Sequence, residues 1–277
     1  AGLSFVGSTP VAKHLRIRGI ENDKRVQAFG SGKNHMIVLP DADLDMAADA
    51  SVSAAYGAAG QRCMAISVVV AVGDIGDQLV AKIAQRIPDI VVGSTADSAV
   101  QLGPVISRES KQRIHGFIEG AERSGASLVV DGRLQDDQDG WLVGASLVDH
   151  VKPGMPVYDE EVFGPVLSIV RASTYQEAMD IVASHPLGNG AAIFTRDGGA
   201  AKRYADDIQA GMVGINVPIP VPPWSPSFGG WKASAFTDSK ISGPESLNFH
   251  TRVKAITSRW PDPAESKVDL GFLKTDR

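Results

Sequence analysis

The sequence predicts an α/β fold in which helices cover a mostly parallel sheet, and three observations support this prediction. Strand-like and helical segments alternate along the chain, most regularly between residues 166 and 206. Residues 68–72 are apolar throughout, as in a strand that is buried on both faces of a sheet. Hydrophobic residues make up 43% of the 277-residue chain and charged residues 21%, which provides enough apolar surface for a sizeable core.

The predicted elements follow from local patterns. Apolar runs bounded by turn-forming residues indicate strands at residues 3–6, 35–39, 68–72, 128–130, 166–171 and 190–194. Amphipathic or alanine-rich patterns indicate helices at residues 11–18, 75–87, 107–124, 175–184 and 199–206, with a further long helix opening at residue 41.

Two of these helices carry clear start signals. Ser8 or Thr9 can cap the first helix, and the fixed φ of Pro10 suits its first turn. The alanine-rich helix opens with Asp41 and Asp43, whose carboxylates suit the positive end of a helix dipole.

Other segments interrupt the alternation. Residues 135–140 form a polar loop, and residues 218–226, with five prolines, must be irregular. Residues 248–260 alternate like an exposed strand, and the tail after residue 261 is polar.

Charge and termini limit the functional classes. A net charge of −5 and a pI near 5.7 disfavour nucleic acid or an anionic membrane as partner. No apolar run approaches the roughly 20 residues that span a bilayer, and the first residues lack the features of a signal peptide. We therefore expect a cytoplasmic protein. Because the chain begins without Met and with a strand already under way, we also expect it to come from a longer protein.

The only cysteine, Cys63, cannot form an internal disulfide. It follows the turn Gly60-Gln61-Arg62, which offers flexible backbone, N–H donors and a cation. Such surroundings can stabilise a thiolate and then an oxyanion. Cys63 is therefore a candidate nucleophile, with an inert core cysteine as the alternative.

Two glycine-containing turns are considered as phosphate sites. Gly7 and Ser8 stand where a strand turns into a helix, so they can bind a pyrophosphate, or Ser8 can simply cap the helix. The loop at residues 29–35 lacks the full spacing of a nucleotide-triphosphate loop, so its glycines are expected to permit a close backbone approach instead.

Two aromatic turns add further candidates. In the turn at residues 160–165, Glu161 can bind sugar hydroxyls and Phe163 can stack on a flat ring, although a solvated acidic turn is the alternative. The glycine-rich turn at residues 227–234 either forms the wall of a pocket or closes the fold.

Taken in order, these segments resemble the aldehyde dehydrogenase superfamily from residue 2 to about residue 260. The matching motifs are Gly7-Ser8-Thr9, the loop at 29–35, Gly60-Gln61-Arg62-Cys63, Leu102-Gly103-Pro104-Val105-Ile106-Ser107, Glu160-Glu161-Val162-Phe163-Gly164-Pro165 and Phe228-Gly229-Gly230-Trp231-Lys232-Ala233-Ser234. Within the superfamily the chain most resembles the methylmalonate-semialdehyde dehydrogenases. That choice rests on Lys33-Asn34-His35, Gly60 to Ala65, Gly214-Ile215-Asn216-Val217 and the ending from Thr251-Arg252 to Trp260.

The chain departs from the general superfamily pattern in two places. Most members carry a glutamate in the glycine-rich loop to activate water, whereas this chain has Ala28-Phe29 and no glutamate between Glu21 and Glu109. Water needs such a base more than the readily ionised thiol of coenzyme A does, so a CoA-acylating enzyme is expected. Arg62 suits a substrate with a carboxylate, with a structural ion pair as the alternative.

The resemblance also implies a mechanism. The Cys63 thiolate attacks malonate or methylmalonate semialdehyde, and the Cys63 backbone N–H helps to hold the oxyanion. Hydride passes to NAD, whose pyrophosphate lies at Gly7 and Ser8 and whose nicotinamide end contacts Glu161 and Phe163. After loss of carbon dioxide, coenzyme A accepts the acyl group as acetyl-CoA or propionyl-CoA. A homo-oligomer, a dimer or tetramer, is expected, and no metal site is predicted.

By this resemblance, residues 1–34 are the end of a Rossmann-like NAD-binding domain and residues 35–243 are a catalytic domain. Residues 244–262 are expected to form an oligomerisation strand and residues 263–277 a polar tail. Family members are about twice as long, so this chain alone is expected to be inactive. The alternatives are a non-catalytic binding module, an NAD(P)-dependent aldehyde dehydrogenase of another substrate range, and a cysteine hydrolase that uses Cys63 with His35 or His115.

Overall fold

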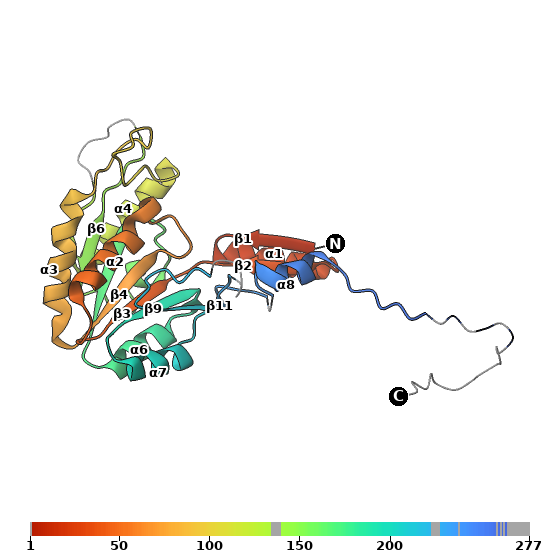
Figure 1. Ribbon diagram of the computed structural model, residues 1–277. Helices are drawn as coiled ribbons and strands as arrows, with labels where there is room; N and C mark the ends of the chain where they lie inside the picture. The colour runs from red at the N-terminus through yellow and green to blue at the C-terminus, as the bar shows by residue number, and fades with distance from the viewer. Residues whose placement is uncertain are drawn as a thin grey trace.

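The computed structural model describes residues 2–133, 140–222, 228–237, 239–258, 260, 262 and 264. Its centre is a seven-stranded sheet in the order β10-β9-β3-β4-β7-β6-β5, in which only β5 runs antiparallel to its neighbour (Figure 1). The strands are β3 (Asn34–Val38), β4 (Ile66–Val72), β5 (Ser127–Val130), β6 (Ser146–Asp149), β7 (Val166–Ala172), β9 (Gly190–Phe194) and β10 (Met212–Ile215). The predicted α/β fold with a mostly parallel sheet is confirmed.

Helices cover both faces of this sheet. One face carries α2 (Leu44–Tyr56) and α3 (Gly76–Arg86), and the other carries α4 (Arg108–Arg123), α5 (Pro156–Asp159), α6 (Tyr175–Ser184) and α7 (Gly198–Asp207). Successive side chains of a strand point to opposite faces, so Val68 and Val70 of β4 join one core and Val69 and Ala71 join the other. This two-sided burial explains why residues 68–72 are apolar without alternation.

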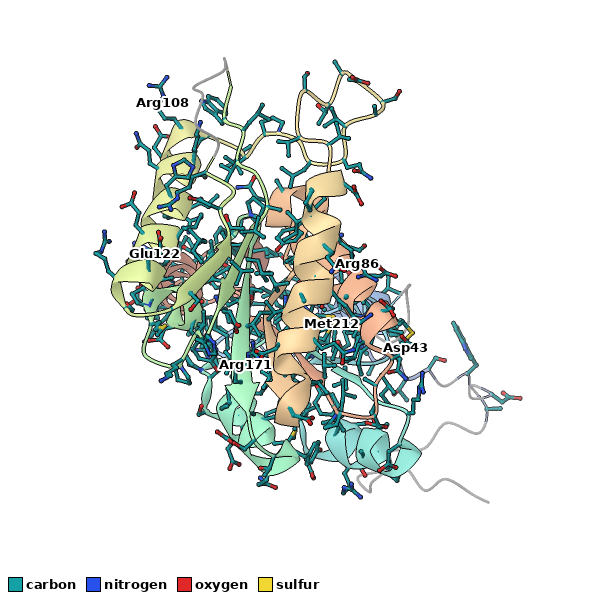
Figure 2. All side chains as sticks on the ribbon, turned by 90° about the vertical axis from the view of Figure 1, so that its left-hand side faces the viewer. Asp43, Arg86, Arg108, Glu122, Arg171 and Met212 are labelled. Carbon is teal, nitrogen blue, oxygen red and sulfur yellow. The ribbon has the colours of Figure 1, made fainter. Side chains whose placement is uncertain are left out.

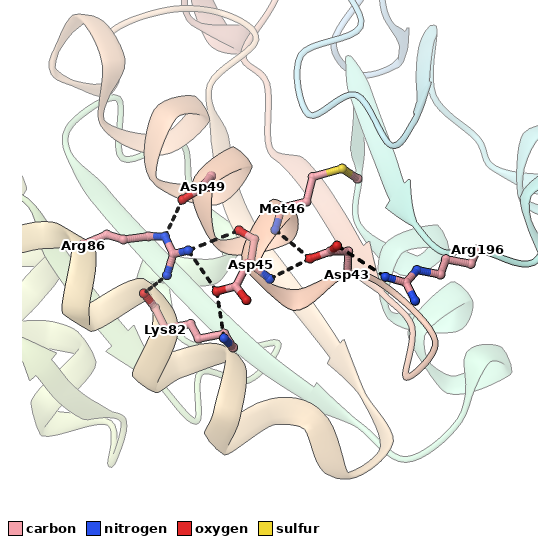
Figure 3. Close-up of polar contacts among 7 residues, drawn as sticks. All are labelled: Asp43, Asp45, Met46, Asp49, Lys82, Arg86 and Arg196. Atoms are coloured by element: carbon pink, nitrogen blue, oxygen red, sulfur yellow. Dashed lines mark hydrogen bonds and ion pairs between the residues drawn. The ribbon is translucent and has the colours of Figure 1, made fainter.

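Polar contacts hold α2 and α3 together on the outer surface (Figure 3). As predicted, an aspartate starts α2: Asp43 accepts hydrogen bonds from the backbone N–H groups of Asp45 and Met46, both at 3.1 Å. From α3, Arg86 reaches the Asp45 carboxylate at 3.1 Å and the Asp49 carboxylate at 2.5 Å.

Ion pairs also join α3 to the sheet near the end of β7. Arg171, labelled in Figure 2, pairs with Asp149 of β6 at 2.6 Å and with Asp77 of α3 at 3.0 Å. The longest described helix, α4, has 16 residues. No helix in the described ranges has the length and apolarity needed to cross a bilayer.

A smaller unit stands beside the central sheet (Figure 1). Its strands β1 (Gly2–Val6) and β2 (Arg25–Phe29) pair in parallel, and α1 (Thr9–Glu21) connects them. The helix α8 (Gly243–His250), near the other end of the chain, packs on this unit. Phe249 lies against Gly2, and Arg25 donates to the backbone carbonyls of Asn248 and Thr251 at 3.0 and 2.9 Å.

The prediction of a strand beginning at Asn248 is wrong, because this residue lies within α8. Ser242 precedes the helix, and Pro244 occupies its first turn, where the missing N–H of proline does no harm. Described residues from Thr251 onward belong to no strand, and no strand within the described ranges pairs with them.

Five strands were not among the sequence predictions: β2, β6, β10 and the two-residue strands β8 (Leu187–Gly188) and β11 (Trp231–Lys232), which pair with each other in an antiparallel arrangement. The predicted loop at 135–140 lies outside the described residues except for Gly140. The same holds for 223–226 in the proline-rich loop and for almost all of the polar tail. The described part of the proline-rich loop, 218–222, contains no helix or strand, as predicted.

Candidate active site

The candidate site lies where the small unit meets the central sheet. Because β3, β4, β7 and β9 are parallel, the segments before them gather at one edge: the loop 30–33, Cys63, the turn 160–165 and Asn189. Opposite this edge, Gly7 and Ser8 follow the carboxyl end of β1. The site therefore combines the amino ends of one sheet with the carboxyl ends of another.

A tightly wound turn presents Cys63. Ala58, Ala59 and Gly60 all have left-handed backbone angles, with φ of 53°, 54° and 65°. A Cβ atom on Gly60 would lie 2.2 Å from the Gly164 carbonyl oxygen, so only glycine fits there. This backbone conformation is strained for the two alanines. The three residues form the turn that leads to the thiol.

Gln61 holds this turn in place through two side-chain hydrogen bonds. Its side-chain oxygen accepts the Ile106 N–H at 3.0 Å, and its amide donates to the Phe163 carbonyl at 3.4 Å. Gln61 thus links the loop before α4 to the turn 160–165.

Cys63 is an exposed free cysteine, but its surroundings do not favour the thiolate on balance. Loss of hydration raises the pKa of the Cys63 thiol, and the Glu161 carboxylate adds to this effect. The backbone N–H groups of Cys63 and Met64 act in the opposite direction, as does Arg62 more weakly. Arg62 therefore lowers the thiol pKa, as expected from its charge, but burial outweighs it, so the expectation of a thiol pKa below the usual value is wrong for this structure.

Arg62 is engaged with the end of α2. Its Nη2 atom donates to the carbonyls of Ser53 and Ala54 at 2.6 and 3.0 Å, in the last turn of the helix, where the Ser53 carbonyl also accepts the Gly57 N–H. A Cβ on Gly57 would lie 2.8 Å from Nη2, so the guanidinium occupies the space beside this glycine. Arg62 is a helix cap rather than the alternative ion pair, and its role in substrate binding stays a prediction.

Glu161 and Phe163 line one small cavity with Arg62. The Glu161 Oε1 atom accepts the Gly32 N–H at 2.9 Å, whereas Oε2 receives no hydrogen bond from the described residues. Phe163 has a left-handed φ of 50°, and the residue is 38% exposed. One carboxylate oxygen and one aromatic ring are thus open to a ligand.

Gly7 and Ser8 lie next to the glycine-rich loop. Thr9 Oγ1 accepts the Ser31 N–H at 3.0 Å, and the Thr9 N–H approaches Ser31 Oγ at 3.3 Å. Ser8 is the N-cap residue of α1, but its hydroxyl makes no capping hydrogen bond and stays available. This 13-residue helix with an uncommitted hydroxyl at its N-terminus fits an anionic group such as a pyrophosphate.

The glycine-rich turn near the end of the chain closes the fold behind this loop. Ser234 donates from its hydroxyl to the Ser31 carbonyl at 2.7 Å, and its own carbonyl accepts the Gly30 N–H at 2.9 Å. Of this predicted turn, Ser227 lies outside the described residues.

Three buried residues of the site were not identified as site residues from the sequence. Lys33 is only 2% exposed and donates from Nζ to the carbonyls of Val157 and Glu160 at 2.7 and 2.8 Å. Burial lowers the pKa of Lys33 to about 7, against the attraction of nearby carboxylates. The other two are Asn34 and Asn189, whose amides both donate to the Cys63 carbonyl. Only the matching motif Lys33-Asn34-His35 drew attention to any of them.

The histidines do not serve Cys63 as a base. His35 is buried, and its ring nitrogens contact the Lys33 carbonyl at 2.9 Å and the Tyr158 hydroxyl at 3.2 Å. Burial holds the pKa of His35 well below its usual value. His115 lies on α4 among charged residues, and neither histidine contacts Cys63 within the described ranges. The structure gives the cysteine-hydrolase alternative no support.

The fold and the site together define an α/β protein with a candidate nucleophilic thiol at one edge of its central sheet and a strand-to-helix turn in the adjoining small unit. The model of the aldehyde dehydrogenase family matches residues 1–256. The chain belongs to the aldehyde dehydrogenase family.

Similar proteins come from several bacteria. The chain is 48% identical over 270 residues to the malonate-semialdehyde dehydrogenase of Pseudomonas aeruginosa, covering 96% of this chain and 54% of the relative. The crystal structure of methylmalonate-semialdehyde dehydrogenase from Oceanimonas doudoroffii is 50% identical, with a TM-score of 0.91, and the match covers 94% of this chain and 54% of that one.

A provisionally assigned methylmalonate-semialdehyde dehydrogenase from Sinorhizobium meliloti 1021, crystallised with NAD, is 49% identical with a TM-score of 0.92. The match covers 96% of this chain and 55% of that one. The chain thus spans about half the length of the relatives it matches.

Proposed function

We propose that the protein containing this chain is an NAD-dependent, CoA-acylating dehydrogenase of malonate or methylmalonate semialdehyde. The observation that carries this proposal is Cys63, the only thiol, at a sheet edge that it shares with Glu161 and with the loop 30–33, which contacts Thr9 directly after Gly7 and Ser8. The family membership and the named activities of the relatives support it.

The chain's own residues account for the covalent steps. The Cys63 sulfur bonds to the aldehyde carbon, and the Cys63 N–H donates to the resulting oxyanion. Glu161 Oε2 holds a ribose hydroxyl, Phe163 supports a planar ring, and Gly7 with Ser8 holds a pyrophosphate. When bound, NAD supplies a hydride acceptor.

Coenzyme A is proposed as the acyl acceptor because the glycine-rich loop provides no base for water. Ala28 and Phe29 are both buried and carry no carboxylate. Loss of carbon dioxide breaks the carbon–carbon bond to the substrate carboxylate, and the resulting thioester enolate takes a proton from water. The thiolate of coenzyme A then attacks the acyl carbon, a new carbon–sulfur bond forms, and the bond to Cys63 breaks. The Cys63 thiolate leaves and is ready for another cycle.

The assay follows NADH formation from malonate semialdehyde with and without coenzyme A, in the natural protein after its intact mass has been measured. We expect turnover only with coenzyme A, and none in Cys63→Ser. Turnover without coenzyme A would indicate an aldehyde dehydrogenase that hydrolyses its thioester. No turnover in a protein of full family length would leave a binding module as the better explanation.

Arg62 is proposed to bind the substrate carboxylate through Nη1, which makes no hydrogen bond to the described residues, while Nη2 caps α2. In the complete enzyme, Arg62→Leu should lower kcat/KM for malonate semialdehyde about tenfold more than for propanal, which lacks the carboxylate. Equal losses on both aldehydes would restrict Arg62 to its capping role.

The segment after α8 is proposed to join copies of the protein. Val253, Ile256 and Trp260 are 97%, 81% and 92% exposed, a pattern that a single chain rarely leaves uncovered. Pairing with a second copy would also supply the missing hydrogen-bond partners. Light scattering should give the mass of a dimer or tetramer, and a monomer after Val253→Glu and Ile256→Glu together.

A further inference from the structure

Two asparagine side chains hold the backbone carbonyl of Cys63. Asn34 stands at the start of β3 and Asn189 directly before β9, and each donates from Nδ2 to this carbonyl oxygen at 2.9 Å. Both side chains are buried. Two strands of the central sheet therefore fix the position of a single peptide group beside the thiol.

The asparagines are themselves anchored. Asn34 also donates to the Ala65 carbonyl at 2.8 Å and accepts the Gly190 N–H at 2.9 Å. Asn189 contacts the Met64 sulfur at 3.2 Å. Neither amide can turn away without breaking a second contact, so the hydrogen bonds to the Cys63 carbonyl are held in place.

Glycines surround this arrangement closely. A Cβ on Gly32 would lie 3.1 Å from the Cys63 carbonyl oxygen, and a Cβ on Gly230 would lie 3.0 Å from the Asn189 Cα. At Gly190, a Cβ would lie 2.4 Å from the Met64 methyl group. Larger residues at these positions would displace the Asn34 and Asn189 amides or the Cys63–Met64 peptide.

The peptide group between Cys63 and Met64 connects these hydrogen bonds with the Cys63 sulfur. The Cys63 carbonyl and the Met64 N–H belong to one planar trans peptide, so they point in opposite directions. Within the described part of the chain, the N–H groups of Cys63 and Met64 donate to no oxygen. Both act to lower the pKa of the adjacent Cys63 thiol. Donors on the carbonyl also polarise the peptide and strengthen its N–H as a donor.

We propose that Asn34 and Asn189 are positioning residues that fix the Cys63–Met64 peptide and keep the Met64 N–H directed at the Cys63 sulfur. The inference rests on the proposed role of Cys63 as nucleophile. It adds that two side chains bound to the Cys63 carbonyl set the stability of the thiolate.

The test is the pH dependence of Cys63 alkylation by iodoacetamide, which is unambiguous because the chain has one cysteine. In Asn189→Ala, loss of a hydrogen bond to the carbonyl should move the midpoint of the rate profile to higher pH. Alkylation at pH 7 should then slow about three- to tenfold. Asn216→Ala is the matched control, because Asn216 bridges the N–H and carbonyl of Thr195 at the far end of β9, both at 3.0 Å.

A second variant keeps the test interpretable if Asn189→Ala does not fold. Asn189→Asp keeps the size of the side chain but replaces the donor with a negative charge, so its midpoint should move further than that of Asn189→Ala. The Met64 amide ¹⁵N and ¹H shifts should change in both variants. A folded Asn189 variant with the wild-type profile and wild-type Met64 shifts would overturn the inference.

The experiment separates this inference from the proposed function, since alkylation requires neither NAD nor an aldehyde. A shifted profile in a protein that forms no NADH would keep the positioning role and reject the dehydrogenase. NADH formation with an unchanged alkylation profile would keep the dehydrogenase and reject the positioning role of the two asparagines.

Discussion

At the residue scale, Gly60 decides whether Cys63 can be presented at all, because its φ of 65° and its contact with Gly164 exclude a side chain. Gly60→Ala should lower the free energy of unfolding by about 1–3 kcal/mol, the usual range for such strain. Urea denaturation measures this change.

Gly116→Ala is the control, because a Cβ there meets nothing within 4 Å in the middle of α4. It should raise the stability by about 0.5–1 kcal/mol. Equal effects of the two substitutions would contradict the close approach at Gly60.

His35 predicts a loss of stability in mild acid. Its folded-state pKa is held well below 6.5, mainly by burial, whereas the unfolded chain binds a proton near pH 6.5. As the pH falls below about 6.5 the unfolded state binds more protons, so stability falls, by up to about 1.4 kcal/mol per pH unit for this group.

Unfolding by urea between pH 7 and pH 5 measures this slope, to which the buried His185 also contributes because its pKa is lowered. His35→Gln should reduce the slope. A slope that is the same with and without His35 would show that its charging is not linked to unfolding.

At the scale of the elements, the end of α2 depends on Arg62. Arg62→Ala removes two charge-assisted hydrogen bonds to helix carbonyls and should lower the free energy of unfolding by about 1–2 kcal/mol. Alkylation of Cys63 should change little, because Arg62 is the weakest of the influences on the thiol pKa.

Chemical denaturation and alkylation of the same Arg62→Ala sample check both halves of this expectation. Arg62→Lys is the control, since it keeps the charge near the carbonyls but loses the planar fork. A large change in alkylation with unaltered stability would reverse the assignment and favour direct action on the thiol.

At the scale of the whole molecule, contacts between the two ends of the chain hold the small unit together. Phe249 of α8 is buried against Gly2 and lies under the Arg25 guanidinium, 5.5 Å from ring centroid to Cζ. Phe249→Ala should increase amide hydrogen exchange in β1 and β2 while leaving β3, β4 and β7 protected, because the Phe249 ring contacts Gly2 and Arg25 of the small unit.

Hydrogen exchange read by mass spectrometry tests this expectation. Leu247→Ala is the control in the same helix, because Leu247 is 68% exposed and should leave exchange unchanged. Faster exchange throughout the central sheet in Phe249→Ala would show that the two parts unfold as one.

The sequence by itself determined most of the helices, the buried strands and the family. These follow from local patterns: apolar runs for β4 and β7, amphipathic spacing for α3 and α4, and motifs around Cys63 and Glu161. Such signals depend on neighbours within a few residues, so they survive without knowledge of the fold. Strand β2 and helix α8 were missed because contacts between distant segments stabilise them more than their own residues do.

Only the tertiary structure decided how the site is assembled. Which strand ends share an edge depends on the strand order, and this order brought Asn34 and Asn189 to the Cys63 carbonyl. The same applies to Arg62, whose charge suggested the thiol as its partner but whose side chain ends on the carbonyls of α2. A residue type states which hydrogen bonds a side chain can make, whereas the packing of distant segments selects the ones that form.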